Sequence, residues 1–228
     1  MADQQEQLSL KMYDEEGVRV APDGGAAPAA AVQRVEPAHD AGNEEVPAGR
    51  IIVNPISGER IVIRESGEQT GGLLLSFDLF LPPRAHVPAR HVHPTQEERF
   101  TIVEGRMRFR LGRFGLRTIV ANPGDTVIVP PGTAHWFGNA GAGVTHALVE
   151  ARPALRTEEM FESAAAMSVA RYVPGTKMPR LSELARFLIE FQRELAVPDL
   201  PPFLVRAVLA PLAWLGRRGR NTTAGSAE

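Results

Sequence analysis

The sequence predicts a mainly β domain, built as an antiparallel sandwich or small barrel, with a helical extension after it. Two observations predict this class. Short apolar and β-branched runs recur between residues 51 and 152, and turns rich in Gly and Pro separate them. After residue 152 the pattern changes to apolar residues spaced three and four apart, which is typical of amphipathic helices.

The composition agrees with a packed domain and restricts its chemistry. Of the 228 residues 43% are apolar, and the formal net charge is −2. This balance argues against a nucleic-acid partner, because phosphate binding uses a basic excess. Cysteine is absent, so any metal must be held by histidine and carboxylate groups. The first residues lack a basic segment followed by an apolar one, so we expect a cytoplasmic protein.

Residues 1–48 are expected to form a poorly ordered arm. They are rich in Ala, Gly, Pro and acidic residues, and such a segment cannot bury enough apolar surface to offset its ordering entropy. His39 lies there and is not expected to be a ligand, since a ligand needs a rigid scaffold. We therefore divide the chain into this arm, a β-barrel at 49–154 and a helical extension with a flexible tail at 155–228.

The β-barrel region is justified strand by strand. The segment 106–112 alternates strictly between apolar residues and arginines, which predicts a strand with one face in water. The other runs have similar lengths and end at Gly, Pro or Asn. We expect strands at 50–53, 58–65, 71–81, 98–105, 106–112, 116–122, 125–130, 134–139 and 144–152.

The extension is expected to contain three helices. The first, at 157–172, begins with Thr157 as its cap and has acidic residues in its first turn. The second and third lie at 181–196 and 202–215. The third is shorter than the roughly 20 apolar residues that a membrane span needs, and it contains Arg206. We expect both to bury their apolar faces against the barrel or a second subunit, with an interfacial membrane contact as the alternative.

The segment HVHPTQEERF carries the strongest chemical signal. His91 and His93 are two residues apart, so in a strand their side chains point the same way and can converge on one ion. The glutamates that follow would add a carboxylate to the imidazoles. Such a mixed set suits a divalent transition metal, namely Fe, Mn, Ni, Cu or Zn.

Two motifs in this region resemble those of the cupin superfamily. The first has the spacing His91, one residue, His93, four residues, Glu98, six residues, Gly105. The second follows in the expected order and consists of Gly124, Pro130, Gly132, His135 and Asn139. The resemblance covers about residues 51–152. It implies a small jelly-roll β-barrel that binds one divalent metal through the residues at these positions, which are His91, His93, Glu98 and His135.

Some positions leave alternatives open. Glu97 would fit a shorter form of the first motif, whereas the six-residue gap to Gly105 favours Glu98. His146 alternates with apolar neighbours and is expected to be a packing or surface residue rather than a fifth ligand. Ala85 stands where the first motif often has a glycine, which concerns a turn and not a ligand.

Four protein ligands leave positions open on a six-coordinate ion, as in catalytic sites. The resemblance thus predicts an enzyme, of oxygenase type, acting on a small, largely apolar organic molecule. The alternatives are a Zn-dependent cyclase or isomerase of polyketide type and a non-catalytic, metal-stabilised binding protein. Candidates for an acid or base beside the metal are Glu97, Gln96 and His146. We expect a homodimer and no DNA binding, because the C-terminal helices are too apolar for a helix-turn-helix.

Overall fold

The computed structural model describes residues 31–34, 49–55, 57–112, 114–167, 180–199 and 202–221. The described strands are β1 (Ala31–Arg34), β2 (Ile51–Val53), β3 (Arg60–Glu65), β4 (Leu75–Leu81), β5 (Glu97–Glu104), β6 (Met107–Leu111), β7 (Arg117–Ala121), β8 (Asp125–Val129), β9 (His135–Asn139) and β10 (Thr145–Arg152). The described helices are α2 (Thr157–Ala166), α3 (Leu181–Glu190) and α4 (Pro202–Asn221).

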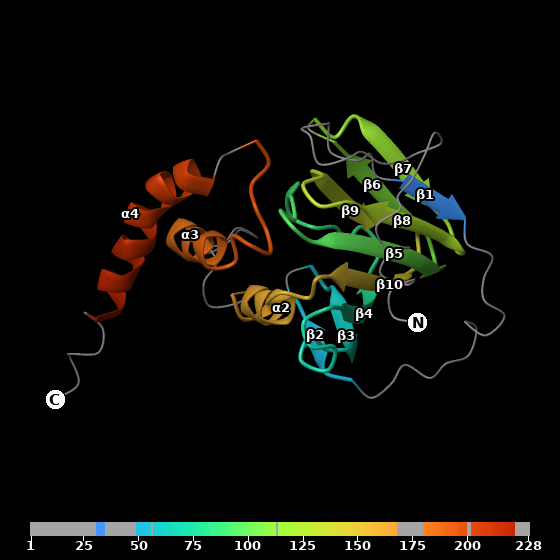
Figure 1. The fold of residues 1–228 in the computed structure, drawn as a ribbon, viewed down its shortest axis with the longest axis horizontal. Coiled ribbons are helices and arrows are strands. Elements are labelled where there is room, and N and C mark those ends of the chain that lie inside the picture. Colours follow the sequence, from blue (N-terminus) through green and yellow to red (C-terminus); the bar gives the residue numbers. More distant parts are fainter. Residues whose placement is uncertain are drawn as a thin grey trace, which may run out of the picture.

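The strands form two sheets that face each other as a jelly roll, so the predicted mainly β fold is confirmed. The larger sheet has seven strands in the order β1-β8-β5-β10-β4-β3-β2, and the smaller has three in the order β7-β6-β9. All paired strands are antiparallel. Figure 1 shows the helices on one side of the barrel, with α2 next to it and α4 farthest away.

Side chains from both sheets meet in one apolar core. The ring of Phe100 in the larger sheet lies 5.2 Å from that of Phe109 and 5.0 Å from that of Phe137, both in the smaller sheet. The alternation predicted for β6 is confirmed, with Met107 buried and the arginines exposed. Burying each such large apolar side chain stabilises the fold by about 1.5–3 kcal/mol.

Gly105 of the first motif makes the turn between β5 and β6. Its φ is 76°, a conformation that side chains with a Cβ rarely adopt. A Cβ at this position would also lie 2.8 Å from the carbonyl oxygen of Val144. Both constraints explain why the motif has a glycine at the end of the strand that carries Glu98.

Two details of the predicted helices are wrong. Thr157 is not the N-cap of α2; Arg156 occupies that position, and Thr157 is the first helical residue, with its hydroxyl engaged by Gln96. The second predicted helix, at 181–196, ends at Glu190, because the residues after it turn and Ala196 forms a β-bridge with Val92. Residues 168–172 of the first predicted helix lie outside the described residues.

Part of the N-terminal arm is a strand. Residues 31–34, within the segment expected to lack order, form β1 and pair with β8, so for these four residues the prediction is wrong. A short strand with little apolar surface can still form when a sheet edge offers backbone partners. His39 and the other residues between 1 and 48 lie outside the described part of the chain.

The last helix does not lie against the barrel. It packs on α3, and Phe203 and Val208 on its surface remain 69% and 65% exposed. None of the described helices has both the length and the apolarity needed to cross a membrane. The expected homodimer stays a prediction.

Candidate metal centre

The backbone brings the two sequence motifs together. His91 and His135 form an antiparallel bridge in which each backbone N–H donates to the other residue's carbonyl oxygen at 2.9 Å. The N–H of Gly132, in the Pro-Gly turn of the second motif, donates to the carbonyl of His93 at 2.8 Å. The two motifs therefore lie side by side, although the bridged residues His91 and His135 are 44 positions apart in the sequence.

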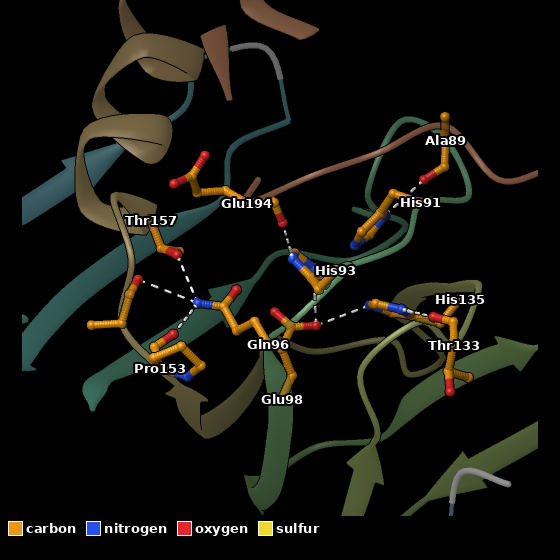
Figure 2. Close-up of polar contacts among 11 residues, drawn as sticks. Ala89, His91, His93, Gln96, Glu98, Thr133, His135, Pro153, Thr157 and Glu194 are labelled. Atoms are coloured by element: carbon orange, nitrogen blue, oxygen red, sulfur yellow. Dashed lines mark hydrogen bonds and ion pairs between the residues drawn. The ribbon is translucent and has the colours of Figure 1, made fainter. Parts of the chain in front are cut away.

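Three imidazoles and one carboxylate converge inside the barrel at this place. One potential ligand atom from each of His91, His93, Glu98 and His135 lies within 4.8 Å of all the others, and the four side chains are buried. Figure 2 shows the histidine rings and the carboxylate directed toward a common space. The structure thus gathers the four residues that the sequence predicted, among them Glu98 from the inward face of β5.

The competing candidates Glu97 and His146, and also His86, which lies outside both motifs, are located elsewhere. Glu97 is on the opposite face of β5, where its carboxylate is 3.6 Å from the guanidinium of Arg99. His146 is on the outer side of β10, with Nε2 2.6 Å from Asp78. His86 contacts the Trp136 ring at 5.4 Å between centroids. None of these three belongs to the cluster.

Each imidazole of the cluster is held in the same tautomer. Nδ1 of His91 donates to the carbonyl of Ala89 at 3.1 Å, and Nδ1 of His135 donates to that of Thr133 at 3.1 Å. Nδ1 of His93 donates to the carbonyl of Glu194 at 2.5 Å. A carbonyl oxygen can only accept, so Nδ1 carries the hydrogen in each ring. In the neutral form of each ring the lone pair is then on Nε2, which is the nitrogen that a metal ion would bind.

The donor atoms fit a metal ion. Oε2 of Glu98 lies 3.3 Å from Nε2 of His93 and 2.9 Å from Nε2 of His135. These three buried atoms have no hydrogen-bond partner in suitable geometry among the described residues. Ligands about 2.0–2.2 Å from one ion and at right angles to each other lie about 3 Å apart. A bound divalent cation would therefore satisfy the three atoms at close to their present separation.

The electrostatics of the cluster also favour a cation. Burial, reinforced by His135, lowers the pKa of His91 well below its ordinary value, and burial lowers that of His93. Burial therefore disfavours a positive charge on both rings. Burial alone would raise the pKa of the Glu98 carboxyl, but the neighbouring His93 and His135 outweigh it and lower that pKa to about 2. Neutral imidazoles with an ionised carboxylate form the protonation state that binds metal.

Gln96, which the sequence suggested as an acid or base beside the metal, makes structural hydrogen bonds instead. It is fully buried, and its Nε2 lies within hydrogen-bonding distance of the carbonyls of Pro153 and Ala154 and of the hydroxyl of Thr157. This side chain connects the strand that carries Glu98 to the start of α2 (Figure 2).

Sequence reasoning missed the role of Glu194. Its backbone carbonyl accepts from a predicted ligand, and its buried carboxylate accepts from the backbone N–H of Arg156 at 3.3 Å. A carbonyl contact has no residue-type signature. Only the position of the chain after α3 reveals it.

A surface cleft lies behind the cluster. It has a volume of about 380 Å³ and is lined by Arg90, Arg110, Phe114, Gly115 and Trp136. Arg90 and Trp136 are adjacent in sequence to the bridged histidines, and neighbouring side chains on a strand point to opposite faces. The cleft is therefore on the outward side of the ribbon, and the four clustered residues do not line it.

Comparison with known proteins gives a family for this geometry. Residues 78–149 match the family model described as Cupin domain. A germin-like protein, subfamily T member 3, from Arabidopsis thaliana is 29% identical over 92 residues, which is 32% of this chain. The matched part spans 40% of that protein's length.

The solved structures with similar backbones include other cupins. A sugar phosphate isomerase of the cupin superfamily from Silicibacter pomeroyi aligns with a TM-score of 0.41 and 19% identity, over 48% of this chain and 74% of that one. The Cnp3 cupin domain of Schizosaccharomyces pombe has a TM-score of 0.41 and 13% identity, over 51% and 77%. The jelly roll, the two complete motifs and the matching family model together identify a cupin domain at residues 78–149 of this chain.

Proposed function

We propose that this protein is a metal-dependent enzyme of oxygenase type that acts on a small, largely apolar organic molecule. The observation that carries the proposal is the convergence of three imidazole nitrogens and one carboxylate oxygen within 4.8 Å of one another inside the barrel. The barrel does not need this cluster for its stability, since the aromatic core already joins the two sheets.

Four protein donors leave coordination positions free on an ion that prefers six ligands, and free positions distinguish catalytic from structural metals. When bound, a redox-active ion would supply electron transfer between the substrate and dioxygen. The residues of this chain would hold the ion, and their present contacts keep the imidazoles in one tautomer and the Glu98 carboxyl ionised. Three uncharged imidazoles and one carboxylate contribute a charge of −1, so a centre with a divalent ion would keep a net positive charge.

The surroundings of the cluster are apolar and suit an apolar substrate. The ring of Phe137 lies 6.2 Å from that of His91 and 6.3 Å from that of His135, with Phe100 packed behind it. Such walls exclude water and strengthen electrostatic interactions at the site. An organic molecule with one polar group to orient it fits these walls better than a highly charged one.

The placement of acidic groups favours oxygen chemistry over a non-redox cyclase or isomerase. A non-redox proton transfer is best served by a positioned acid or base besides the metal ligands. Besides Glu98, the buried carboxyls among the described residues are those of Asp78, Asp125 and Glu194. Asp78 is paired with Arg64 and His146 on the outer face, Asp125 accepts from the backbone N–H of Asn122, and the carboxylate of Glu194 points to α2. Gln96 holds backbone carbonyls and cannot exchange protons.

Elemental analysis of protein purified without added metal tests this proposal. We expect Fe, Mn, Ni or Cu close to one per chain, and oxygen uptake with small enols, diols or phenols that stops in Glu98→Ala. Zn with no oxygen uptake would replace the oxygenase with the cyclase or isomerase alternative. Failure to bind any of these ions, even after reconstitution, would overturn the proposal together with both alternatives, because all of them use a metal.

A further inference from the structure

We infer that residues 191–199, here called the C-terminal strap, are a working part of the metal centre. The strap fixes the ring of His93, so that docking of the strap and metal binding stabilise each other. This inference rests on the proposed metal binding and adds a positioning element from outside the region matched to the cupin model, which ends at residue 149.

The strap runs antiparallel beside the segment that carries two of the predicted ligands. The carbonyl of Glu194 accepts from Nδ1 of His93 at 2.5 Å. Ala196 and Val92 exchange two backbone hydrogen bonds, of 2.8 and 3.0 Å. Farther along, the carboxylate of Asp199 lies 3.4 Å from the guanidinium of Arg90. The contacts follow the two segments in antiparallel order, on both sides of one isolated β-bridge between Val92 and Ala196.

The other side of the strap is held at the start of α2. The buried carboxylate of Glu194 accepts from the backbone N–H of Arg156, at the helix N-terminus, where a negative charge is favoured. The guanidinium of Arg156 lies 5.2 Å from the ring of Phe191, a strap residue that is 1% exposed. Gln96 fixes the start of α2 to the barrel. The strap therefore contacts α2 on one side and the segment that carries His91 and His93 on the other (Figure 2).

His93 is the one histidine of the cluster that depends on a distant segment. The acceptors for His91 and His135 are carbonyls two residues away, which come with the local turn. The acceptor for His93 is 101 residues away. Without the strap this ring would lose the partner that selects its tautomer and orientation. Loss of such a partner lowers metal affinity by roughly 10- to 100-fold.

Coupling of this kind is reciprocal. If the docked strap strengthens metal binding by a given factor, the bound metal favours the docked strap by the same factor. The backbone N–H of Ala196 reports on docking directly, because it donates to the carbonyl of Val92 in the bridge between the two segments. Its hydrogen exchange should therefore slow when the metal binds.

The test uses the full chain, Co²⁺ as the probe and two matched substitutions. Ala196→Pro removes the N–H that donates to Val92, whereas Ala207→Pro disturbs α4, which packs on α3. We expect Ala196→Pro to weaken Co²⁺ binding, measured by competition with a chelator, by roughly 10- to 100-fold and to change the visible spectrum of the Co²⁺ protein. Ala207→Pro should retain the affinity and spectrum of the wild type.

The outcomes separate this inference from the proposed function. A wild-type protein that binds no divalent metal overturns the proposed function. Wild-type affinity in Ala196→Pro, with metal binding intact, overturns the role of the strap alone. Should Ala196→Pro fail to fold, hydrogen exchange of the wild type decides: slower exchange at residues 191–196 on adding Co²⁺ supports the coupling, and unchanged exchange overturns it.

Discussion

Oε2 of Glu98 lies 2.9 Å from Nε2 of His135, and the two residues come from strands of different sheets. Glu98 extends inward from β5 in the seven-stranded sheet, and His135 begins β9 in the three-stranded sheet. The contact therefore spans the interior of the barrel. An ion held by both residues would join the sheets at the point where they also meet through Phe100 and Phe137.

Replacing any one ligand should empty the site. We expect Glu98→Ala and His135→Ala to reduce bound metal to a small fraction of one ion per chain, because each leaves only three donor residues and these are too few to hold the ion tightly. Glu97→Ala is the matched control, since its side chain lies on the outer face. Metal content by elemental analysis distinguishes them. Loss of metal in Glu97→Ala with retention in Glu98→Ala would contradict the register seen in β5.

The clustering of His91, His93, Glu98 and His135 was predictable from the sequence, whereas the contact with the strap was not. Strand spacing could place His91 and His93 on one side, and the resemblance to the cupin motif implied Glu98. The alternation in β6 was predictable for the same reason. Contacts made by backbone groups depend on where a distant segment runs. Neither the end of α3 at Glu190 nor the bond from His93 to Glu194 has a local signature.

Asp78 and its partners form a polar network separate from the metal centre. Asp78 is fully buried, with Arg64 at 2.7 Å and His146 at 2.6 Å. Asp78→Ala should destabilise the protein by about 2–4 kcal/mol, because it leaves two polar groups without their anion. The free energy of unfolding by urea measures this. His146→Ala should leave metal content unchanged; reduced metal content in that variant would make His146 a ligand after all.

The same network predicts a difference in acid stability. Burial alone would raise the pKa of Asp78, but His146 and Arg64 outweigh it and lower the pKa below the ordinary value of 3.8. The unfolded chain then binds the proton first as the pH falls. The contribution of Asp78 is complete above pH 3.8 and is lost as the pH falls through its lowered pKa. The difference in the free energy of unfolding between the wild type and Asp78→Asn, measured by urea titration, should therefore decrease as the pH falls below 3.8. A constant difference from pH 6 to 2 would contradict the lowered pKa.

The strand β1 pairs with β8, so part of the N-terminal arm belongs to the larger sheet and is expected to contribute to its stability. Deleting residues 1–30 should leave the melting temperature nearly unchanged, because β1 and every described contact of the barrel remain. Deleting residues 1–34 removes β1 and leaves the edge of β8 unpaired. Each lost backbone hydrogen bond costs about 0.5–1.5 kcal/mol.

In a protein of this size each kcal/mol shifts the melting temperature by roughly 2–4 °C. The longer deletion should therefore lower it by several degrees and increase aggregation through the exposed edge. Calorimetry and light scattering on the two deletions compare them directly. Equal melting temperatures would show that the pairing of β1 adds nothing to stability, and an equal loss in both would assign the stabilisation to residues before Ala31.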